Sequence, residues 1–496
     1  MNVNPITRLD YPDPDVIRVE DTYYMVSTTM HFMPGCEILQ SFDLVHWEHA
    51  TYVYETLDHT DAQQLKSGHN IYGQGMWAAS LRYHEGRFYI CFVANDTRKT
   101  YLYTSEKIDG PWKKQLIEGF YHDGSLLFDE DGRNYIVYGN DEIWITELNE
   151  DLTAPKKDGL HRLLVSDHKN PELGYEGSHI QKINGYYYIF LVHSLRDRWM
   201  RTEACFYSDS LEGEFTGGDV LCDDRGYCGQ GVAQGGIVDT PDGKWYAMLF
   251  QDSGAVGRIP ILLPVTWKDH FPVFGQNGHV PEEIEVHSTR PGYIYQPLVG
   301  SDDFCNGLLP RWQFNHDPDP QYYHLDALQG TYTITTREVC TELTQAVNTL
   351  TQRMSYPSCA AEVTVDASAL KEGDVAGLCA LQGCYAAVGI TKHHGKYEVL
   401  MLDKKEDGIL DMTEGTVVES HQMDFRLEAD FCNMKDEARC YYRVNKGDWL
   451  PIGTVHKLYF KLDHFTGCRF GLFCYAAEET GGSACFRDFK YYDVDE

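Results

Sequence analysis

Short apolar runs separated by tight turns dominate the hydrophobic pattern of this 496-residue chain. The runs are rich in Tyr, Phe, Val and Ile, and Asp-Gly, Glu-Gly or Asn-Gly pairs stand between many of them. β-Branched and aromatic residues favour strands, and such pairs favour hairpin turns. Long amphipathic helical patterns are hard to find. The pattern therefore predicts an all-β protein.

Five hairpins in the first three-fifths of the chain share one form. In each, a short apolar run leads through a tight turn into an aromatic strand, and the turns contain Thr22, Gly86, Gly132, Gly185 and Gly243. These turn residues are 46 to 64 positions apart. Four-stranded propeller blades take about 40–50 residues each. The repeat therefore predicts a five-bladed β-propeller catalytic domain over residues 1–298.

The position nine residues before each turn residue has an unusual composition. It is occupied, in chain order, by Asp13, Trp77, Asp123, Glu176 and Gln234. The innermost strands of a propeller surround one axis, so side chains at one repeat position face one central pocket. Carboxyl groups are rarely placed beside buried strands for packing, because their desolvation is costly. We therefore expect a pocket with three acids, although aligned hairpins also arise by chance in all-β proteins.

The remaining region, residues 299–496, lacks this repeat. It carries ten of the fifteen cysteines and short alternating strands such as residues 360–365 and 397–401, with Gly-rich turns between others. This pattern predicts a β-sandwich accessory domain of jelly-roll or concanavalin-like form. No carboxylate cluster in it has a comparable positional argument.

Charge and cysteine usage narrow the class of protein. The formal net charge is -33, and the chain has no Lys/Arg run with which to bind nucleic acid or an anionic membrane. The N-terminal sequence has no secretory signal pattern, and no run of about 18 apolar residues predicts a membrane helix. The scattered cysteines show no zinc spacing, so we expect free thiols, no metal site and a cytoplasmic location. The sequence makes no prediction about oligomeric state.

Three acids and a tryptophan in one ring suit the hydrolysis of a glycosidic bond. One carboxyl group protonates the leaving oxygen, and another attacks the sugar or activates water. A third acid can raise the pKa of the proton donor by like-charge repulsion. The motifs of serine hydrolases, P-loop enzymes and zinc proteases are absent from the sequence.

Several motifs resemble glycoside hydrolase family 43, in the order that the family has them. They are Tyr11-Pro12-Asp13-Pro14-Asp15, Trp77-Ala78-Ala79-Ser80-Leu81, His122-Asp123-Gly124-Ser125-Leu126, Tyr175-Glu176-Gly177-Ser178-His179 and Gly257-Arg258-Ile259-Pro260. The resemblance covers roughly the first three-fifths of the chain, and the tail resembles the β-sandwich that many members append.

The resemblance implies a five-bladed propeller that inverts the anomeric centre. It makes Asp13 the general base and Glu176 the general acid, with Asp123 tuning the pKa of Glu176 and orienting it. Arg258 would bind sugar hydroxyls, and Trp77 would wall the pocket. An inverting pair is expected to lie about 6.5–9.5 Å apart.

Other pocket residues follow less directly from the resemblance. Many family members have a histidine where this chain has Gln234, facing a calcium-filled or water-filled axial channel. We therefore expect no required cofactor and leave Ca2+ in doubt, while Gln234 stays a candidate for substrate binding. His31 and Phe32 are further candidates for lining the pocket, with an ordinary loop position as the alternative for His31.

Members of the family cleave β-xylosides, α-L-arabinofuranosides or both. We expect an exo-acting enzyme that releases xylose and/or L-arabinofuranose from short xylan- or arabinan-derived oligosaccharides. The alternatives are an endo-arabinanase, a five-bladed hydrolase that acts on fructosides, and a non-catalytic carbohydrate-binding protein.

Overall fold

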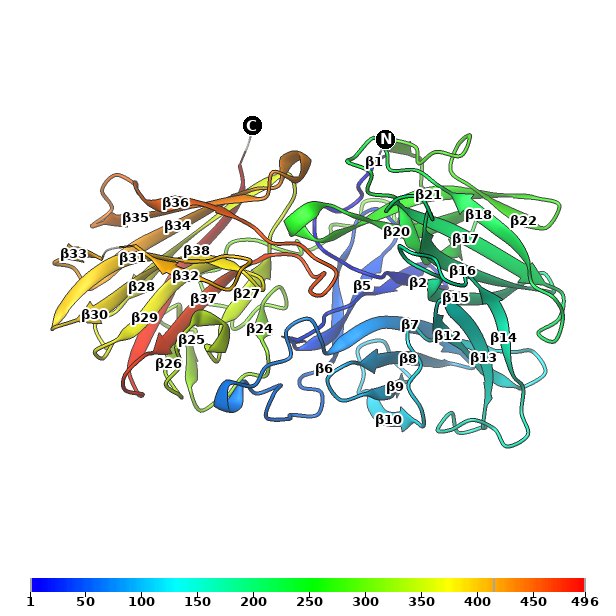
Figure 1. The fold of residues 1–496 in the computed structure, drawn as a ribbon, viewed down its shortest axis with the longest axis horizontal. Helices are drawn as coiled ribbons and strands as arrows, with labels where there is room; N and C mark the ends of the chain where they lie inside the picture. Colours follow the sequence, from blue (N-terminus) through cyan, green and yellow to red (C-terminus); the bar gives the residue numbers. More distant parts are fainter. Residues whose placement is uncertain (1, 414, 495–496) are drawn as a thin grey trace.

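A β-propeller and a β-sandwich lie side by side in the computed structural model, which describes residues 2–413 and 415–494 (Figure 1). This confirms the predicted all-β fold with five blades and a C-terminal sandwich. The helical segments of the described residues are single 3-10 turns, η1 (Lys66–Gly68), η2 (Gly254–Val256), η3 (Leu343–Gln345) and η4 (Cys432–Met434). No helix in those residues has the length and hydropathy needed to cross a membrane.

Each blade of the propeller is an antiparallel sheet of four strands that follow one another in the chain, except that β4 stands between the second and third strands of the first blade. The first blade contains β2 (Asp15–Val19), β3 (Thr22–Val26), β5 (Gly35–Ser41) and β6 (Glu48–Tyr54). The second blade contains β7 (Met76–His84), β8 (Arg87–Ala94), β9 (Lys99–Ser105) and β10 (Lys113–Ile117). The third contains β11 (Ser125–Phe128), β12 (Asn134–Asn140), β13 (Glu142–Leu148) and β14 (His161–Ser166). The fourth blade contains β15 (Glu176–Ile183), β16 (Tyr186–Ser194), β17 (Arg201–Ser208) and β18 (Thr216–Leu221). The fifth contains β19 (Ala233–Asp239), β20 (Trp245–Asp252), β21 (Arg258–Lys268) and β22 (Phe271–Phe274).

Neighbouring blades are held together by apolar packing between their faces. Val26 and Ile38 of the first blade share a buried cluster with Leu81 and Ile90 of the second. The first blade also packs against the fifth through residues such as Met25 and Met248, which closes the ring. Burial of this apolar surface holds the blades together, and hydrogen bonds such as that from the N–H of Leu81 to Asp15 add to it. A short pair of strands, β1 (Asn2–Val3) and β23 (Glu283–Ile284), joins the two ends of the propeller.

The sandwich consists of two antiparallel sheets that enclose one large core. One sheet has the order β32-β31-β30-β29-β37-β27-β24-β4, with β33 beside β31. Its strands are β32 (Leu410–Met412), β31 (Lys396–Lys404), β30 (Tyr385–His393), β29 (Asp374–Leu381), β37 (Arg469–Ala476), β27 (Leu350–Arg353), β24 (Gln313–Asn315), β4 (Phe32–Met33) and β33 (Thr416–Val418). The other is, in order, β25 (Tyr323–Asp326), β26 (Thr331–Thr335), β38 (Ser483–Asp493), β28 (Ser358–Asp366), β34 (Gln422–Asp430), β35 (Glu437–Val444) and β36 (Leu450–Lys457).

The propeller contributes a strand to the sandwich. β4, which lies between β3 and β5 of the first blade, pairs with β24 at the edge of the larger sandwich sheet. A buried ion pair joins Arg353 of the sandwich to Glu37 of the propeller at 2.8 Å. The guanidinium of Arg469 lies 3.5 Å from the centre of the Phe32 ring. These contacts fix the sandwich against the rim of the first blade.

Candidate active site

All five residues of the predicted repeat position line one cavity of about 200 Å³. Trp77, Glu176 and Gln234 are the first or second residues of innermost strands, and Asp13 and Asp123 each lie two residues before one. The periodic hairpins therefore bring side chains from all five blades to the same end of the axis, as the register predicts.

The backbone at this end of the inner strands is irregular. Asp13, Asp123 and Gln234 have positive φ angles of 52°, 49° and 63°. β-Bulges interrupt the pairing directly after Trp77 and Glu176. Positive φ is uncommon outside glycine, and bulges re-aim side chains beside active sites. These conformations cost conformational energy, and they occur where side chains turn out of the sheet to face the axis.

Asp13 is held by two donors at the base of the cavity. Arg258 donates from Nη1 to Oδ1 at 2.7 Å, and the Thr28 hydroxyl donates to Oδ2 at 2.5 Å. Both the aspartate and the arginine are buried, at 4% and 5% exposure. A charge-assisted hydrogen bond in such surroundings fixes the direction of the carboxylate.

Glu176 and Asp123 form a second acidic group with His122 between them. The Nε2 atom of His122 lies 3.5 Å from Oε2 of Glu176 and 3.6 Å from Oδ2 of Asp123. The amide of Asn140 donates to Oε2 of Glu176 at 2.8 Å. The backbone N–H of Gly177 donates to Oδ2 of Asp123 at 3.0 Å, so Asp123 directly holds the residue that follows Glu176.

The charges of this group shift the pKa values in different directions. Burial raises the pKa of Asp123 to about 6. The charge of His122 lowers this pKa, and the charge of Glu176 raises it further. The nearby Asp123 carboxylate is the main cause that raises the pKa of His122 to about 9. Burial acts to raise the pKa of Glu176 as well, but His122 and two arginines outweigh it and hold that pKa below its ordinary value. In the free protein the raised carboxyl pKa therefore belongs to Asp123, whereas the sequence predicts it for Glu176.

Arg201 adds a charge to the cavity lining and is bound from behind by Asp252, and neither residue belongs to the repeat position predicted from the sequence. Asp252 accepts hydrogen bonds from Nε of Arg201 at 3.1 Å and from Nε of Arg258 at 3.2 Å. Burial acts to raise the pKa of Asp252, but the two guanidinium groups lower it overall. The Nη1 atom of Arg201 is buried and has no hydrogen-bond partner among the described residues. Arg201 begins β17 and Asp252 ends β20, so neither stands out in the hydrophobic pattern of its strand.

One wall of the cavity comes from the sandwich domain. Phe465 and Leu462 lie in the segment between β36 and β37 and line the cavity. The Phe465 ring is 3.9 Å from the guanidinium carbon of Arg258 and packs edge to face on Trp77 at 5.1 Å. Two aromatic rings therefore bound the space above the carboxyl groups, one from each domain. Aromatic faces are suited to the apolar faces of sugar rings.

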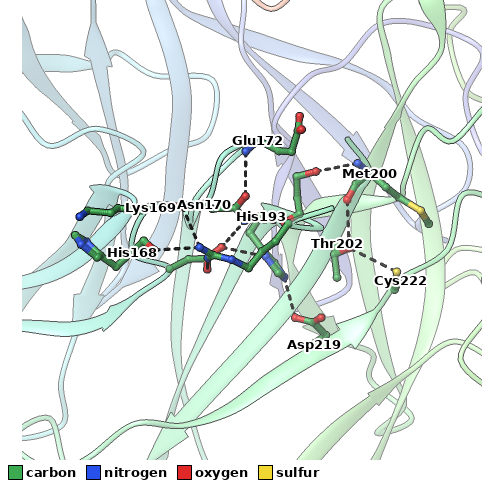
Figure 2. Close-up of polar contacts among 12 residues, drawn as sticks. His168, Lys169, Asn170, Glu172, His193, Met200, Thr202, Asp219 and Cys222 are labelled. Carbon is green, nitrogen blue, oxygen red and sulfur yellow. Dashed lines mark hydrogen bonds and ion pairs between the residues drawn. The ribbon is translucent and has the colours of Figure 1, made fainter. Parts of the chain in front are cut away.

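The wall at Leu173 belongs to the segment that joins β14 to β15, which a polar network holds in place (Figure 2). The N–H of Glu172 donates to Asn170, and Asn170 donates to the carbonyl of Ser194 at 2.8 Å. His193 is bonded to Asp219 at 2.8 Å on the far side of the network. Because Asn170 ties this segment to the end of β16 in the fourth blade, the segment holds Leu173 at the cavity.

A second, much smaller cavity lies on the axis below the acids. Its volume is about 10 Å³, and its lining includes Asp15, Ser178, His179 and Gln234. One oxygen of each of the residues Asp15, Ser178 and Gln234 is buried without a protein partner. Such a volume holds about one water molecule. Calcium takes six to eight oxygen ligands, and in this position some of them would have to be waters. A volume of about 10 Å³ does not fit a calcium ion together with such waters.

Another cavity, with a volume of about 410 Å³, lies at the opposite end of the inner strands. Its cationic residues are already paired, Arg18 with Asp239, Arg82 with Asp15 and Lys182 with Asp129. It contains neither Asp13, Asp123 nor Glu176. The smaller cavity at the acids is therefore the candidate active site.

His31 and Phe32 do not line the active-site cavity, contrary to the expectation from sequence. Pairing of β4 with the sandwich draws both residues into the interface between the domains. There the His31 ring packs between Tyr72, His316 and His464, with centroid distances of 4.8 to 5.3 Å. Burial is the main cause that lowers the pKa of His31 well below its ordinary value. Both residues therefore lie in the domain interface and not in the cavity lining.

Comparisons with known proteins agree with this architecture. The protein-family model described as "Glycosyl hydrolases family 43" matches residues 3–272, and the one described as "Beta xylosidase C-terminal Concanavalin A-like domain" matches residues 301–492. Since the first match covers more than half of the chain, the protein belongs to glycosyl hydrolase family 43. It is a glycoside hydrolase.

Individual relatives match this chain over nearly its whole length. A beta-xylosidase of Formosa agariphila is 26% identical over 99% of this chain and 89% of its own length. A xylosidase/arabinosidase of Butyrivibrio fibrisolvens is 24% identical over 99% of both chains. Among solved structures, a protein described as bifunctional GH43-CE from Bacteroides eggerthii is 41% identical with a TM-score of 0.91. That comparison covers 100% of this chain and 64% of the other, which is longer.

Proposed function

We propose that this glycoside hydrolase is an inverting, exo-acting enzyme that releases xylose and/or L-arabinofuranose from short xylan- or arabinan-derived oligosaccharides. The observation that carries the proposal is the single cavity at which Asp13, Asp123 and Glu176 meet. Its volume of about 200 Å³ is below the roughly 300–1,000 Å³ of pockets for drug-sized ligands. A space of this size suits one terminal sugar residue better than an internal stretch of polysaccharide.

In the proposed reaction, Asp13 acts as the base. It takes a proton from a water molecule, and the oxygen of that water attacks the anomeric carbon. Arg258 and Thr28 hold the carboxylate oxygens in place for this step. An interaction that fixes the geometry before the reaction lowers the barrier, because no reorientation is needed at the transition state.

Glu176 acts as the acid in the same step. It gives its proton to the glycosidic oxygen, the bond to the anomeric carbon breaks, and the leaving alcohol departs neutral. Asp123 orients Glu176 through the backbone of Gly177. Because water attacks from the face opposite to the leaving group, the configuration inverts. The expected separation of about 6.5–9.5 Å between base and acid stays a prediction.

The names of relatives support the substrate class. Relatives across the full length are described as a beta-xylosidase and as xylosidase/arabinosidases, and a partial relative from Bacteroides ovatus as a non-reducing end alpha-L-arabinofuranosidase. Xylopyranosides and L-arabinofuranosides present similar hydroxyl groups in space, so one pocket can accept both. We also propose a cytoplasmic location, supported by the lack of any disulfide within the described residues.

A screen of nitrophenyl glycosides tests the proposal. Release of nitrophenol from the β-xyloside or the α-L-arabinofuranoside is expected, and NMR of the first-formed sugar should show the inverted anomer. Retention of configuration would contradict the roles of Asp13 and Glu176. Fructose release from sucrose would indicate a fructoside hydrolase, internal cleavage of linear arabinan an endo-arabinanase, and sugar binding without turnover a carbohydrate-binding protein.

A further inference from the structure

The segment of residues 458–468, which we call the sandwich loop, completes the active site from the second domain. It lies between β36 and β37 and extends toward the propeller (Figure 1). It carries Leu462 and Phe465 into the cavity, where Phe465 contacts both Arg258 and Trp77. The position of this loop therefore decides whether the sugar site is closed on that side.

One buried carboxylate of the propeller binds the backbones of the sandwich loop and of Arg258 at the same time. Oδ2 of Asp10 accepts the N–H of Gly467 at 2.7 Å, and Oδ1 accepts the N–H of Arg258 at 2.7 Å. Gly467 is two residues after Phe465 in the chain. The N–H of Cys468 adds a bond of 2.8 Å to the carbonyl of Ala255. The loop is thus tied to the backbone immediately before Arg258.

The two backbones approach each other at a distance that only glycine permits. A Cβ atom on Gly467 would lie 2.0 Å from the carbonyl oxygen of Val256. A Cβ on Gly257 would lie 2.2 Å from Oδ1 of Asp10 and 2.8 Å from the Cα of Gly467. Gly257 also has a φ of 103°, which other residues rarely adopt. Both glycines are therefore needed for Asp10 to reach the two N–H groups.

Retention of this carboxylate is costly for folding. Asp10 is 2% exposed, and burial raises its pKa to about 6, although the N–H groups of Gly467 and Arg258 and the charges of Arg353 and Arg469 oppose the shift. Where a buried charged group has no specific role, an apolar side chain of similar volume can often replace it without loss of stability. Its two acceptors are both used on backbone segments that border the active site.

We propose that Asp10 is a positioning residue that aligns the sandwich loop with Arg258 and thereby sets how tightly Phe465 and Leu462 close on the terminal sugar. The proposal rests on the exo-acting glycosidase function proposed above. It assigns substrate affinity to a residue that lies outside the cavity lining and acts through a contact between the two domains.

Kinetics of Asp10→Asn and Phe465→Ala, alone and combined, test the coupling. In Asp10→Asn the new amide NH2 faces one of the two N–H donors, so one hydrogen bond is lost and the loop is displaced. We expect the KM for 4-nitrophenyl β-xyloside or α-L-arabinofuranoside to rise about tenfold, equivalent to ~1.4 kcal/mol, with kcat changed far less. Because both variants act through the same loop, the rise in KM in the double variant should be smaller than the product of the two single effects.

Asp374→Asn is the matched control. Asp374 is another buried aspartate whose pKa burial raises to about 6, and it also accepts a backbone N–H, from Lys371 at 2.8 Å, but it lies in the sandwich away from the cavity. Its KM should equal that of the unmodified protein. An unchanged KM in Asp10→Asn, or KM effects of Asp10→Asn and Phe465→Ala that multiply in the double variant, would overturn the proposal.

Hydrogen exchange gives a second readout that does not depend on turnover. Asp10→Asn should speed exchange in peptides covering the sandwich loop and residues 255–258, and leave the strands of the third blade unchanged. Should Asp10→Asn fail to fold, Gly467→Ala tests the same contact from the other side, because the new methyl group pushes against Val256. If the unmodified protein cleaves no pentoside, the proposed function fails while exchange still decides the role of Asp10. Unchanged loop exchange in an active protein rejects only the role of Asp10.

Discussion

The imidazole of His122 lies 3.5 Å from the carboxylate of Glu176, its Nε2 atom facing Oε2. The nearby carboxylates raise the pKa of His122 to about 9, so the ring is cationic at neutral pH. This cation is the main reason that the pKa of Glu176 is lowered despite its burial. A general acid must carry a proton before it can donate one, so His122 opposes the role proposed for Glu176 in the free enzyme.

Replacement of His122 by glutamine should move the basic limb of the pH profile. Activity falls as pH rises through the pKa of the acid, because deprotonated Glu176 cannot protonate the leaving group. Glutamine removes the positive charge that favours the carboxylate, so that pKa rises and the basic limb of kcat/KM shifts to higher pH. Since Glu176 and Asp123 titrate together, the limb reports the pair. The measurement is kcat/KM on a nitrophenyl pentoside between pH 4 and about 9.

His287→Gln serves as the control for this experiment. His287 is exposed, and its ion-pair partner is Glu285. Its profile should superimpose on that of the unmodified enzyme. A shift of the His122→Gln profile to lower pH would show that His122 does not stabilise the Glu176 carboxylate.

Glu176→Ala should lose activity in proportion to the difficulty of the leaving group. An alkyl or sugar alkoxide needs a proton as it departs, whereas a nitrophenolate is stable without one. We expect a loss of about 10³–10⁴-fold on xylobiose and a much smaller loss on nitrophenyl substrates, since general acid catalysis typically contributes 10²–10⁴-fold. Asp13→Ala should be equally impaired on both, because activation of water does not depend on the leaving group. Equal losses on both substrates for Glu176→Ala would remove it from the acid role.

Arg201→Met tests whether the unpartnered guanidinium nitrogen in the cavity binds substrate. Nη1 of Arg201 has no protein partner, while its Nε is occupied by Asp252. If a sugar hydroxyl accepts a hydrogen bond from Nη1, its loss should lower kcat/KM about 10- to 100-fold, since bonds to charged groups are worth roughly 1.5–3 kcal/mol. Arg290→Met removes an exposed arginine of the propeller that pairs with Asp21, and it should have no effect. Normal kcat/KM in Arg201→Met would limit Arg201 to holding Asp252.

The sequence predicted the propeller part of the site because that part is repeated. The hairpin turn and the residue nine positions before it recur in every blade, so local counting was enough to bring Asp13, Asp123 and Glu176 to one axis. Arg201 also lines the cavity, and Asp252 binds it from behind, but they lie in the third and second strands of their blades and at no shared register position. Repeat counting could not find them.

The contacts between the domains could not be predicted from local sequence patterns. Phe465 lies in an irregular segment more than 200 residues from Arg258, and no periodicity relates the two. His31 and Phe32 show the reverse case, because they were candidates for lining the pocket and lie elsewhere. Pairing of β4 with β24 decided their place instead, and that pairing joins residues that are far apart in the chain.

Removal of metal ions should leave turnover intact, whereas added zinc should inhibit. The proposed proton transfers use carboxyl groups alone, and the axial cavity of about 10 Å³ does not fit a hydrated calcium ion. Ligand atoms of His122, Asp123 and Glu176 lie within 4.8 Å of one another, and histidine with carboxylates is a donor set that zinc accepts. Dialysis against EDTA should therefore leave kcat/KM unchanged, and micromolar to millimolar Zn2+ should compete with substrate less well in His122→Gln. Loss of activity in EDTA that calcium restores would show instead that the axis holds a metal needed for the fold of the site.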